Sequence, residues 1–204
     1  MKILEKNRCN FDFSSDIILE NHRVLLRPLL ALDVENLLHF SIDEPMIWKY
    51  SLIKADGEDN FKNYLNIALN ARDEQKEYPF IVFDKLTNKY AGSTRFYDIQ
   101  LINKSVQLGY TWYGKDFQGT GLNKQCKLLL LEFAFEKMNM ERVEFRADNG
   151  NERSIAAMKR IGCQVEGVLR SHLLKPDGTR RDSVVLSILK AEWENNVKEN
   201  LLKY

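Results

Sequence analysis

The chain has 204 residues and a formal net charge of +1, with 44% hydrophobic and 29% charged residues. This balance is typical of a soluble globular protein that buries a core of its own. The near-zero net charge excludes a general attraction to nucleic acid or to an anionic membrane. No apolar run reaches the roughly 20 residues that span a bilayer, and the N-terminus lacks the apolar stretch of a signal peptide.

The three cysteines, Cys9, Cys126 and Cys163, form no CxxC pair. An odd, scattered set argues for a reducing compartment and against a disulfide framework or a zinc site. We therefore expect a cytoplasmic protein that holds no metal, with thiols that are buried or incidental.

Residues 1–20 are predicted to form an N-terminal arm, because the first 16 are polar and weakly patterned. Residues 21–204 contain no linker, repeat or low-complexity segment, and we expect a single domain there.

Two helices follow a first strand, which is predicted at 22–29. Helical spacing of apolar residues places these helices over 33–40 and 57–75. Acidic residues in the first turn of the second helix and Arg72 in its last turn suit the helix dipole. The side chains expected to be buried on the two helices are Leu32, Leu37, Leu38, Phe61, Leu65, Ala68 and Leu69.

Three strand-like runs come next, at 79–84, 89–99 and 105–113. The turn KLTN joins the first two runs, and the longer turn QLINK joins the second to the third. The three runs therefore predict an antiparallel meander.

The second half alternates helices with strands. Helices are expected over 122–139 and 151–162, a strand at 142–147, and a closing hairpin at 163–174 and 179–189. A docking helix ends the chain, with buried Trp193, Val197 and Leu201, while the helix from 122 buries Leu122, Cys126, Leu129, Leu130 and Phe133. This order predicts an α/β (α+β) fold with a mixed central sheet of about seven strands and helices on both faces.

Residues 118–124 read QGTGLNK and join the aromatic run GYTWY to a long predicted helix. A P-loop would need Gly-Lys-Ser/Thr, and a dinucleotide fingerprint would need a third glycine where Lys124 stands, so both readings fail. Small residues at a helix start let a pyrophosphate approach free backbone amides. The loop therefore indicates a phosphate site, with an ordinary turn and helix cap as the alternative.

These segments together resemble the GNAT superfamily of N-acetyltransferases. The loop matches the family motif Gln/Arg-x-x-Gly-x-Gly/Ala except at its last position, where Asn123 stands. NERSIAAMKRIGCQVEG resembles the second CoA-contacting helix of the family and the strand after it. ENHRVLLRPLLALDVENLL and PDGTRRDSVVLSILKAEW resemble the opening and closing segments of its RimJ/RimL-like branch, which acetylates protein N-termini, including those of ribosomal proteins.

The resemblance covers about residues 20–195. It implies a GNAT-type fold and direct transfer of an acetyl group from the co-substrate acetyl-CoA to a primary amine, such as a protein or peptide N-terminus. The pantetheine arm would pair with residues 111–113 like an added strand, although Trp112 and Tyr113 can equally be core aromatics. The residues implied in acetyl-CoA binding are Thr111, Trp112, Tyr113, Gln118, Gly119, Thr120, Gly121, Leu122, Asn123, Lys124, Asn151 and Ser154.

The general acid of many relatives is missing. They carry a Tyr seven residues after the Asn that corresponds to Asn151, and this chain has Met158 there, which cannot donate a proton. Ser154 lies one turn after Asn151 on the same helix face, and the RimL-like branch assigns the acid role to a Ser at this position. We therefore expect Ser154 to be catalytic, with a helix-surface hydroxyl as the alternative. Asn151 can serve as a helix cap, as a CoA contact, or as both.

The general base is also unassigned. Relatives place a Glu where this chain has Gln107 or Leu173, and neither side chain accepts a proton usefully. His172 has a suitable intrinsic pKa, but it neighbours Leu173 on a strand and would face the opposite way. An α-amine, with a pKa of about 8, can also react without a base, because a useful fraction is neutral near pH 7.

The acceptor side is expected from the segment 41–60, which contains Trp48, Tyr50 and the acids Asp43, Glu44 and Asp56. Such acids can attract a cationic amine or simply face solvent. Asp182 and Arg170 match recurrent positions of the branch and are implied to shape the acceptor pocket.

Two other functions compete with an enzyme. The missing acid and base leave open a non-catalytic acyl-CoA sensor on the same fold. An RNA-associated module is disfavoured by the low net charge and the lack of an aromatic-basic signature. A homodimer is one assembly that the branch implies; no nucleic-acid or membrane partner is expected.

Overall fold

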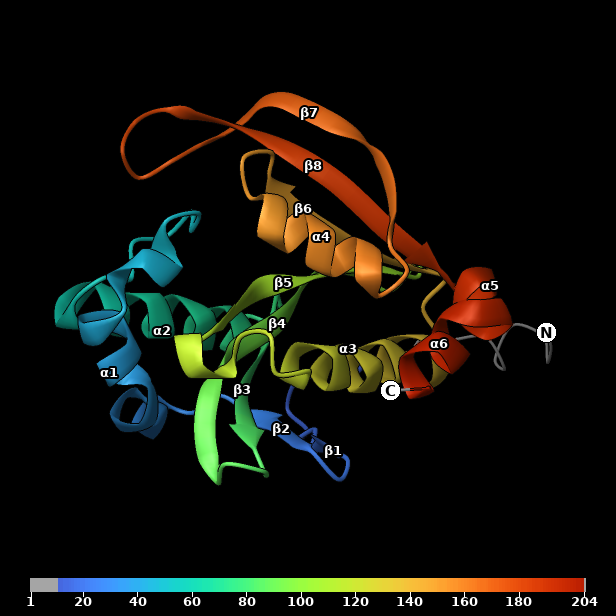
Figure 1. Ribbon diagram of the computed structural model, residues 1–204, viewed down its shortest axis with the longest axis horizontal. Helices are drawn as coiled ribbons and strands as arrows, with labels where there is room; N and C mark the ends of the chain where they lie inside the picture. The colour runs from blue at the N-terminus through green and yellow to red at the C-terminus, as the bar shows by residue number, and fades with distance from the viewer. Residues whose placement is uncertain (1–10, 204) are drawn as a thin grey trace.

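The computed structural model describes residues 11–203, which form one eight-stranded sheet in the order β1-β2-β3-β4-β5-β6-β8-β7 (Figure 1). All seven predicted strands are present, and a two-residue β1 that pairs with β2 adds the eighth. The strands are β1 (Leu19–Glu20), β2 (Val24–Pro28), β3 (Tyr78–Asp84), β4 (Lys89–Gln100), β5 (Ser105–Tyr113), β6 (Arg142–Asp148), β7 (Gln164–Leu174) and β8 (Arg180–Leu189).

Helices cover both faces of the sheet, as predicted. Adjacent residues of β5 show this, because strand side chains alternate between faces. The Trp112 ring packs on Phe40 and Phe61, which belong to the helices α1 (Val34–Asp43) and α2 (Glu58–Asp73). The side chain of Thr111 instead meets Lys127 of α3 (Leu122–Glu132).

Three helical segments complete the second face and the C-terminus. The helix α3 continues as a single π-helical turn, Phe133–Lys137, and α4 is Glu152–Arg160. The C-terminal helix consists of α5 (Lys190–Glu192), a π-helical turn at Trp193–Val197, and α6 (Lys198–Leu202). Its predicted docking residues Trp193, Val197 and Leu201 are all buried, and α6 packs on α3.

One predicted core residue is wrong. Leu32 is 75% exposed, whereas the neighbouring Asp33 is buried. Asp33 accepts two hydrogen bonds from the Arg27 guanidinium and one from the amide of Leu30. This buried ion pair draws Asp33 inward at the start of α1, and the turn at Ala31–Asp33 then points Leu32 toward solvent. The other helical positions predicted to be buried are buried or half-buried.

Residues 11–20 of the predicted arm lie against the body of the protein. Phe11 makes edge contacts with Tyr78 and Phe133. The Tyr78 hydroxyl donates to the carbonyl of Ser15 and accepts from the amide of Ile17. The rest of the predicted arm, residues 1–10, lies outside the described residues.

The strands β5 and β6 are parallel neighbours, but only three residue pairs join them, from Ser105↔Arg142 to Gln107↔Glu144. Beyond Gln107 the two strands separate. Among the described residues, β5 continues to Tyr113 with β4 as its only partner strand, and β6 continues to Asp148 paired with β8. The sheet therefore contains a wedge-shaped gap, and the backbone edges that face it need partners from outside the sheet.

We expect the variant Gly92→Ala to lose stability, because a Cβ at this position of β4 would lie 2.0 Å from the carbonyl oxygen of Trp112 on β5. Strand β5 would have to move, and overpacking of this kind lowers the free energy of unfolding by about 1–3 kcal/mol. Urea denaturation measures the loss. Gly167→Ala on the edge strand β7 is the matched control, because its Cβ would meet nothing within 4 Å. Equal stability of the two variants would contradict the close approach of β4 and β5.

Candidate active site

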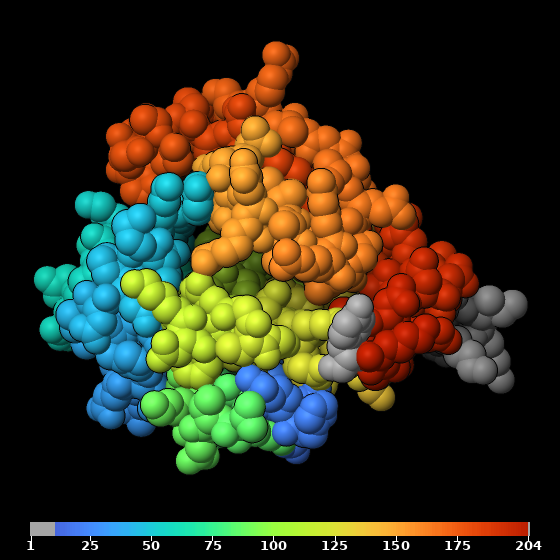
Figure 2. Space-filling model, in the orientation of Figure 1, coloured from blue at the N-terminus to red at the C-terminus, as the bar shows by residue number. Residues whose placement is uncertain are grey.

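A cavity of ≈ 260 Å³ lies at the gap between β5 and β6. Figure 2 shows the surface hollowed between the loop before α3, the helix α4 and the segment before α2. The lining comes from far apart in the sequence and comprises Ile47, Trp48, Tyr50, Ser51, Leu52, Tyr64, Tyr97, Gln107, Tyr110, Thr111, Trp112, Arg146, Ala147, Asp148, Ser154, Leu173 and Arg181.

A β-bulge shapes the β5 wall of the cavity. Ser93 pairs with Trp112 and Arg95 with Gly109, so that Tyr110 and Thr111 together face the single residue Thr94. Tyr110 takes a left-handed conformation with φ 49°, which is uncommon for a non-glycine residue. The buried Arg95 guanidinium stacks 3.9 Å from the Tyr110 ring centroid and pairs with Glu77. This contact helps to hold the bulge in place.

The loop before α3 presents free backbone amides. Gly119 and Gly121 have φ of 77° and 87°, a region that favours glycine, and a Cβ at either would meet nothing within 4 Å. The amides of Gly119, Thr120, Gly121 and Asn123 donate to no group within residues 11–203. Unpaired amides at the start of an 11-residue helix, with open space beside the two glycines, fit the predicted phosphate site.

The predicted loop residues are tied to both neighbouring elements. The Gln118 side chain donates to the carbonyl of Tyr113 at the end of β5, and accepts from Arg153 of α4. The Asn151 side chain caps α4 by accepting from the amide of Ser154. The loop, the end of β5 and the start of α4 therefore form one connected unit. Leu122, by contrast, buries its side chain in the core.

Several predicted residues meet in the cavity. Thr111, Trp112 and Ser154 line it, and so do Gln107 and Leu173, which stand where relatives carry acids. Trp112 also packs 4.7 Å from Trp48 by ring centroid, so its side chain is a core aromatic as well as a wall of the cavity. Tyr113 is buried and Met158 is buried beneath α4; neither lines the cavity.

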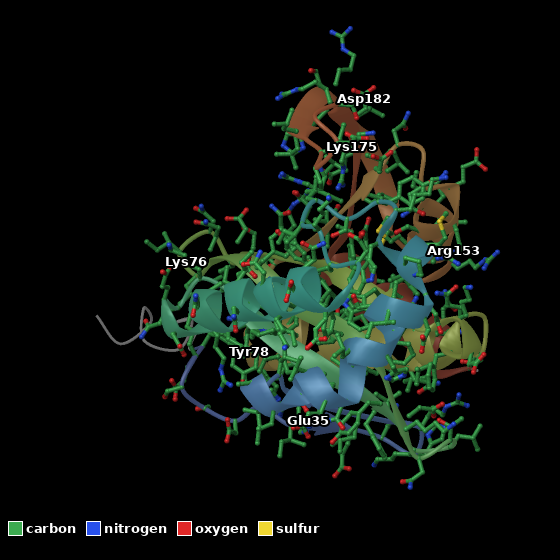
Figure 3. All side chains as sticks on the ribbon, turned by 90° about the vertical axis from the view of Figure 1, so that its left-hand side faces the viewer. Glu35, Lys76, Tyr78, Arg153, Lys175 and Asp182 are labelled. Atoms are coloured by element: carbon green, nitrogen blue, oxygen red, sulfur yellow. The ribbon has the colours of Figure 1, made fainter. Side chains whose placement is uncertain are left out.

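Other predicted residues lie elsewhere. His172 does not line the cavity; its Nδ1 lies 3.1 Å from Ser183 Oγ, while the adjacent Leu173 faces inward. Burial and the nearby guanidiniums lower the pKa of His172. Asp182 is exposed on the projecting β7–β8 hairpin, apart from Arg153 (Figure 3), and Arg170 is also exposed.

The segment 41–60 supplies part of the acceptor side through its aromatics rather than its acids. Trp48 and Tyr50 line the cavity, and the Tyr50 hydroxyl donates to the carbonyl of Gly150 just before α4. Glu44 accepts from the amide of Lys115. The remaining predicted acids of this segment, Asp43 and Asp56, are exposed and outside the cavity.

Sequence reasoning missed three charged residues of the lining: Arg146, Asp148 and Arg181. Asp148 ends β6 three residues before Asn151. Its position between a predicted strand and the predicted CoA-contacting helix was the sequence signal that could have identified it. Among the cavity-lining residues that the structure describes, Asp148 is the only carboxylate. Arg181 follows Arg180 in the run TRRDS, and no feature of the sequence indicates which of the two arginines lines the cavity.

Lys127 is buried in α3, behind the β5 wall of the cavity. Its ammonium donates to the Thr111 hydroxyl at 2.8 Å and lies over the ring of Phe145. No carboxylate within residues 11–203 pairs with it. Burial lowers the pKa of Lys127 to about 8. A lysine kept in such surroundings is destabilising while it is charged.

We expect Lys127→Met to raise the free energy of unfolding by about 1–3 kcal/mol at pH 7, because the buried charge is removed. The unfolded lysine, with a pKa near 10.4, binds a proton more readily than the folded one between pH 8 and pH 10. Stability of the wild type should therefore rise with pH through this window, and the variant should lack that rise. Urea denaturation across pH 7–10 measures both effects. Exposed Lys137→Met is the control, and equal pH dependence in all three proteins would refute the assignment.

Metal sites and membrane spans do not appear in the described part of the chain. Residues 11–203 hold no group of three His, Cys, Asp or Glu side chains placed to bind a metal, and none of their helices is long and apolar enough to cross a membrane. Cys126 and Cys163 are free buried thiols, and burial raises the pKa of each to about 12. Cys9 lies outside the described residues.

Comparison with known proteins agrees with this geometry. The family profile described as "Acetyltransferase (GNAT) domain" matches residues 23–164. The YdaF protein of Bacillus subtilis, named as a candidate ribosomal N-acetyltransferase, is 36% identical over 178 residues, which cover 85% of this chain and 95% of YdaF. A candidate acetyltransferase structure from T. thermophilus has a TM-score of 0.83 at 31% identity, covering 93% of this chain and 97% of that one.

A candidate ribosomal-protein-serine acetyltransferase from Vibrio cholerae shares the fold, with a TM-score of 0.72 at 22% identity over 85% of this chain and 98% of that one. The profile match and the relatives above 30% identity establish more than a shared fold. The chain is an acyltransferase that belongs to the GNAT acetyltransferase family.

Proposed function

We propose that residues 21–204 form one domain that transfers an acetyl group from acetyl-CoA to a primary amine, with a protein or peptide N-terminus as the acceptor. One observation carries this proposal: the unpaired edge of β5 and Ser154 lie at one gap in the sheet, and the loop with the unpaired amides is tied to the end of β5. The names of YdaF and of the Vibrio cholerae protein refer to ribosomal acceptors, which favours protein N-termini.

The chain's own groups suit two parts of acetyl-CoA, the pyrophosphate and the pantetheine arm. The amides of Gly119, Thr120, Gly121 and Asn123 suit the pyrophosphate, because they donate to no group within residues 11–203. The β5 edge at residues 111–113 suits the amides of the pantetheine arm, because no strand pairs with it on the side of β6. When bound, acetyl-CoA supplies the acetyl group as a thioester, whose leaving sulfur needs a proton.

The acceptor amine must reach the cavity in its neutral form. Asp148 offers the carboxylate to which a cationic amine can give its proton. Gln107, which lines the same cavity, offers a hydrogen-bond acceptor. Its Nε2 donates to Asp98 at 2.7 Å, which leaves the buried Oε1 without a partner in residues 11–203. Asp148 therefore takes the role of base, and Gln107 orients the amine.

Ser154 takes the role of acid. Its amide is capped by Asn151, which fixes the first turn of α4, and its side chain lines the cavity. The hydroxyl can therefore deliver a proton toward the leaving sulfur. Met158, one turn further along α4, is buried and carries no proton to give.

We expect Ser154→Ala to lower kcat by about 100-fold, the usual contribution of a general acid. Affinity for acetyl-CoA, measured by calorimetry, should stay within about twofold, because the amides before α3 are untouched. Ser154→Thr keeps the hydroxyl and should retain most of the activity. Thiol release with N-terminal peptides and small amines is the assay. Unchanged turnover in Ser154→Ala would remove Ser154 as the acid, whereas acetyl-CoA binding without turnover of any amine by the wild type would favour a sensor.

We expect Asp148→Asn to lower kcat/KM by about 100-fold at pH 7 and by less than about tenfold at pH 9. An α-amine with a pKa near 8 is mostly charged at pH 7 and mostly neutral at pH 9, so the need for a base falls as the pH rises. A pH series of kcat/KM measures the difference. Exposed Asp73→Asn is the control. A loss of equal size at every pH would show a structural role for Asp148 instead.

A further inference from the structure

The cavity contains buried polar atoms that lack partners. Five of its lining residues have a buried side-chain atom with no hydrogen bond to any described residue: Trp48 Nε1, Tyr64 Oη, Gln107 Oε1, Trp112 Nε1 and Arg181 Nε. Buried polar groups are normally paired, so unpaired ones gathered around a cavity point to a ligand. Two indoles and a guanidinium can only donate. The cavity therefore suits a ligand group rich in hydrogen-bond acceptors.

Arg181 is the only charged residue among these five. It is only 7% exposed, it lines the cavity from β8, and its side chain forms no ion pair or hydrogen bond with residues 11–203. A guanidinium stays charged in proteins, and a largely buried charge that no carboxylate contacts directly is unfavourable. A bound anion would supply the missing counter-charge and hydrogen-bond acceptors.

The other charges around the cavity do not pair directly with Arg181. Arg146 also lines the cavity; its Nε binds Glu144, which is shared with Arg142. Asp148 lines the cavity and attracts Arg181 electrostatically, but no ion pair or hydrogen bond joins their side chains within residues 11–203. The phosphates of acetyl-CoA are matched by the loop before α3, and none of residues 118–124 lines this cavity. The anion that Arg181 needs must therefore belong to the acceptor.

We propose that the acceptor is an amine that carries a carboxylate close by, with Arg181 binding the carboxylate while Asp148 and Gln107 face the amine. This inference rests on the proposed acetyl transfer and names its substrate class. A peptide N-terminus with an acidic side chain among its first residues has this chemistry, and so does a free amino acid. The bulge residue Tyr110, with Tyr64 and Tyr97, lines the same cavity with aromatic rings.

The test compares matched acceptors on the whole enzyme with acetyl-CoA. Hexapeptides with Glu at position 1, 2 or 3 are each paired with the same peptide carrying Gln, and free glutamate is run beside glutamine. We expect the best Glu acceptor to exceed its Gln partner in kcat/KM by about 10- to 100-fold, as a buried charge-assisted contact would give. Preference among peptides would identify an acidic N-terminus, and preference only for free glutamate would identify an amino acid.

Variants of Arg181 test whether this residue causes the preference for Glu over Gln acceptors. Arg181→Met removes the charge and should reduce the Glu/Gln ratio to within about twofold, because neither acceptor then meets a cation at this position. Arg181→Lys keeps the charge and should retain part of the ratio. Arg180→Met is the matched control, because Arg180 binds Ser171 outside the cavity. Equal use of Glu and Gln acceptors by the wild type, or an unchanged ratio in Arg181→Met, would overturn the inference.

Failure of the proposed transfer would be seen separately. If the wild type releases no thiol with any amine, calorimetry of the same acceptors on the CoA-loaded protein still tests the inference. Tighter binding of a Glu acceptor that is lost in Arg181→Met would support the anion site, and equal binding of Glu and Gln acceptors would refute it.

Discussion

The separation of β5 from β6 is the constraint on which the rest of the site depends. Only three residue pairs join these parallel strands. Beyond them, β5 remains paired with β4 and β6 remains paired with β8, so the sheet has two halves that diverge. On the side away from the gap, β5 keeps its hydrogen bonds to β4 and β6 keeps its hydrogen bonds to β8, so both strands remain part of the sheet. The inner edges keep backbone groups that a ligand can pair with, and the bulge at Tyr110, stacked on Arg95, turns β5 so that Thr111 and Trp112 reach the cavity.

The site holds charges that folding alone does not favour. Lys127 and Arg181 are both buried and form no direct ion pair with a carboxylate among the described residues, although Asp148 attracts Arg181 from a longer distance. Burial lowers the pKa of each. Unpaired buried charge reduces stability, so its presence around one cavity is better explained by binding and catalysis than by packing. The two charges lie on different sides of the cavity. Lys127 donates a hydrogen bond to Thr111 on β5, and Arg181 lines the cavity from β8.

Much of the architecture was predictable because periodicity reports burial directly. The helical spacing of Trp193, Val197 and Leu201 predicted a docked C-terminal helix, and those residues are buried. The prediction failed at Leu32, because an ion pair between Arg27 and Asp33 outweighs hydrophobic spacing over one short turn. The loop before α3 could also be predicted from local sequence, because the positive φ angles at Gly119 and Gly121 favour glycine. Helical spacing predicted that Ser154 lies one turn after Asn151, and Asn151 caps the first turn of α4, which contains Ser154.

The sequence by itself determined the order of the elements, the helix-start loop and the membership of Ser154 in the same helix as Asn151, because these depend on residues close together in the chain. Only the tertiary structure decided which side chains share the cavity. Tyr50 reaches Gly150 across 100 positions, and Asp148, Arg181 and Gln107 come from three different strands. Their meeting depends on strand register and on the divergence of β5 from β6, and long-range pairing of that kind leaves no local pattern in the sequence.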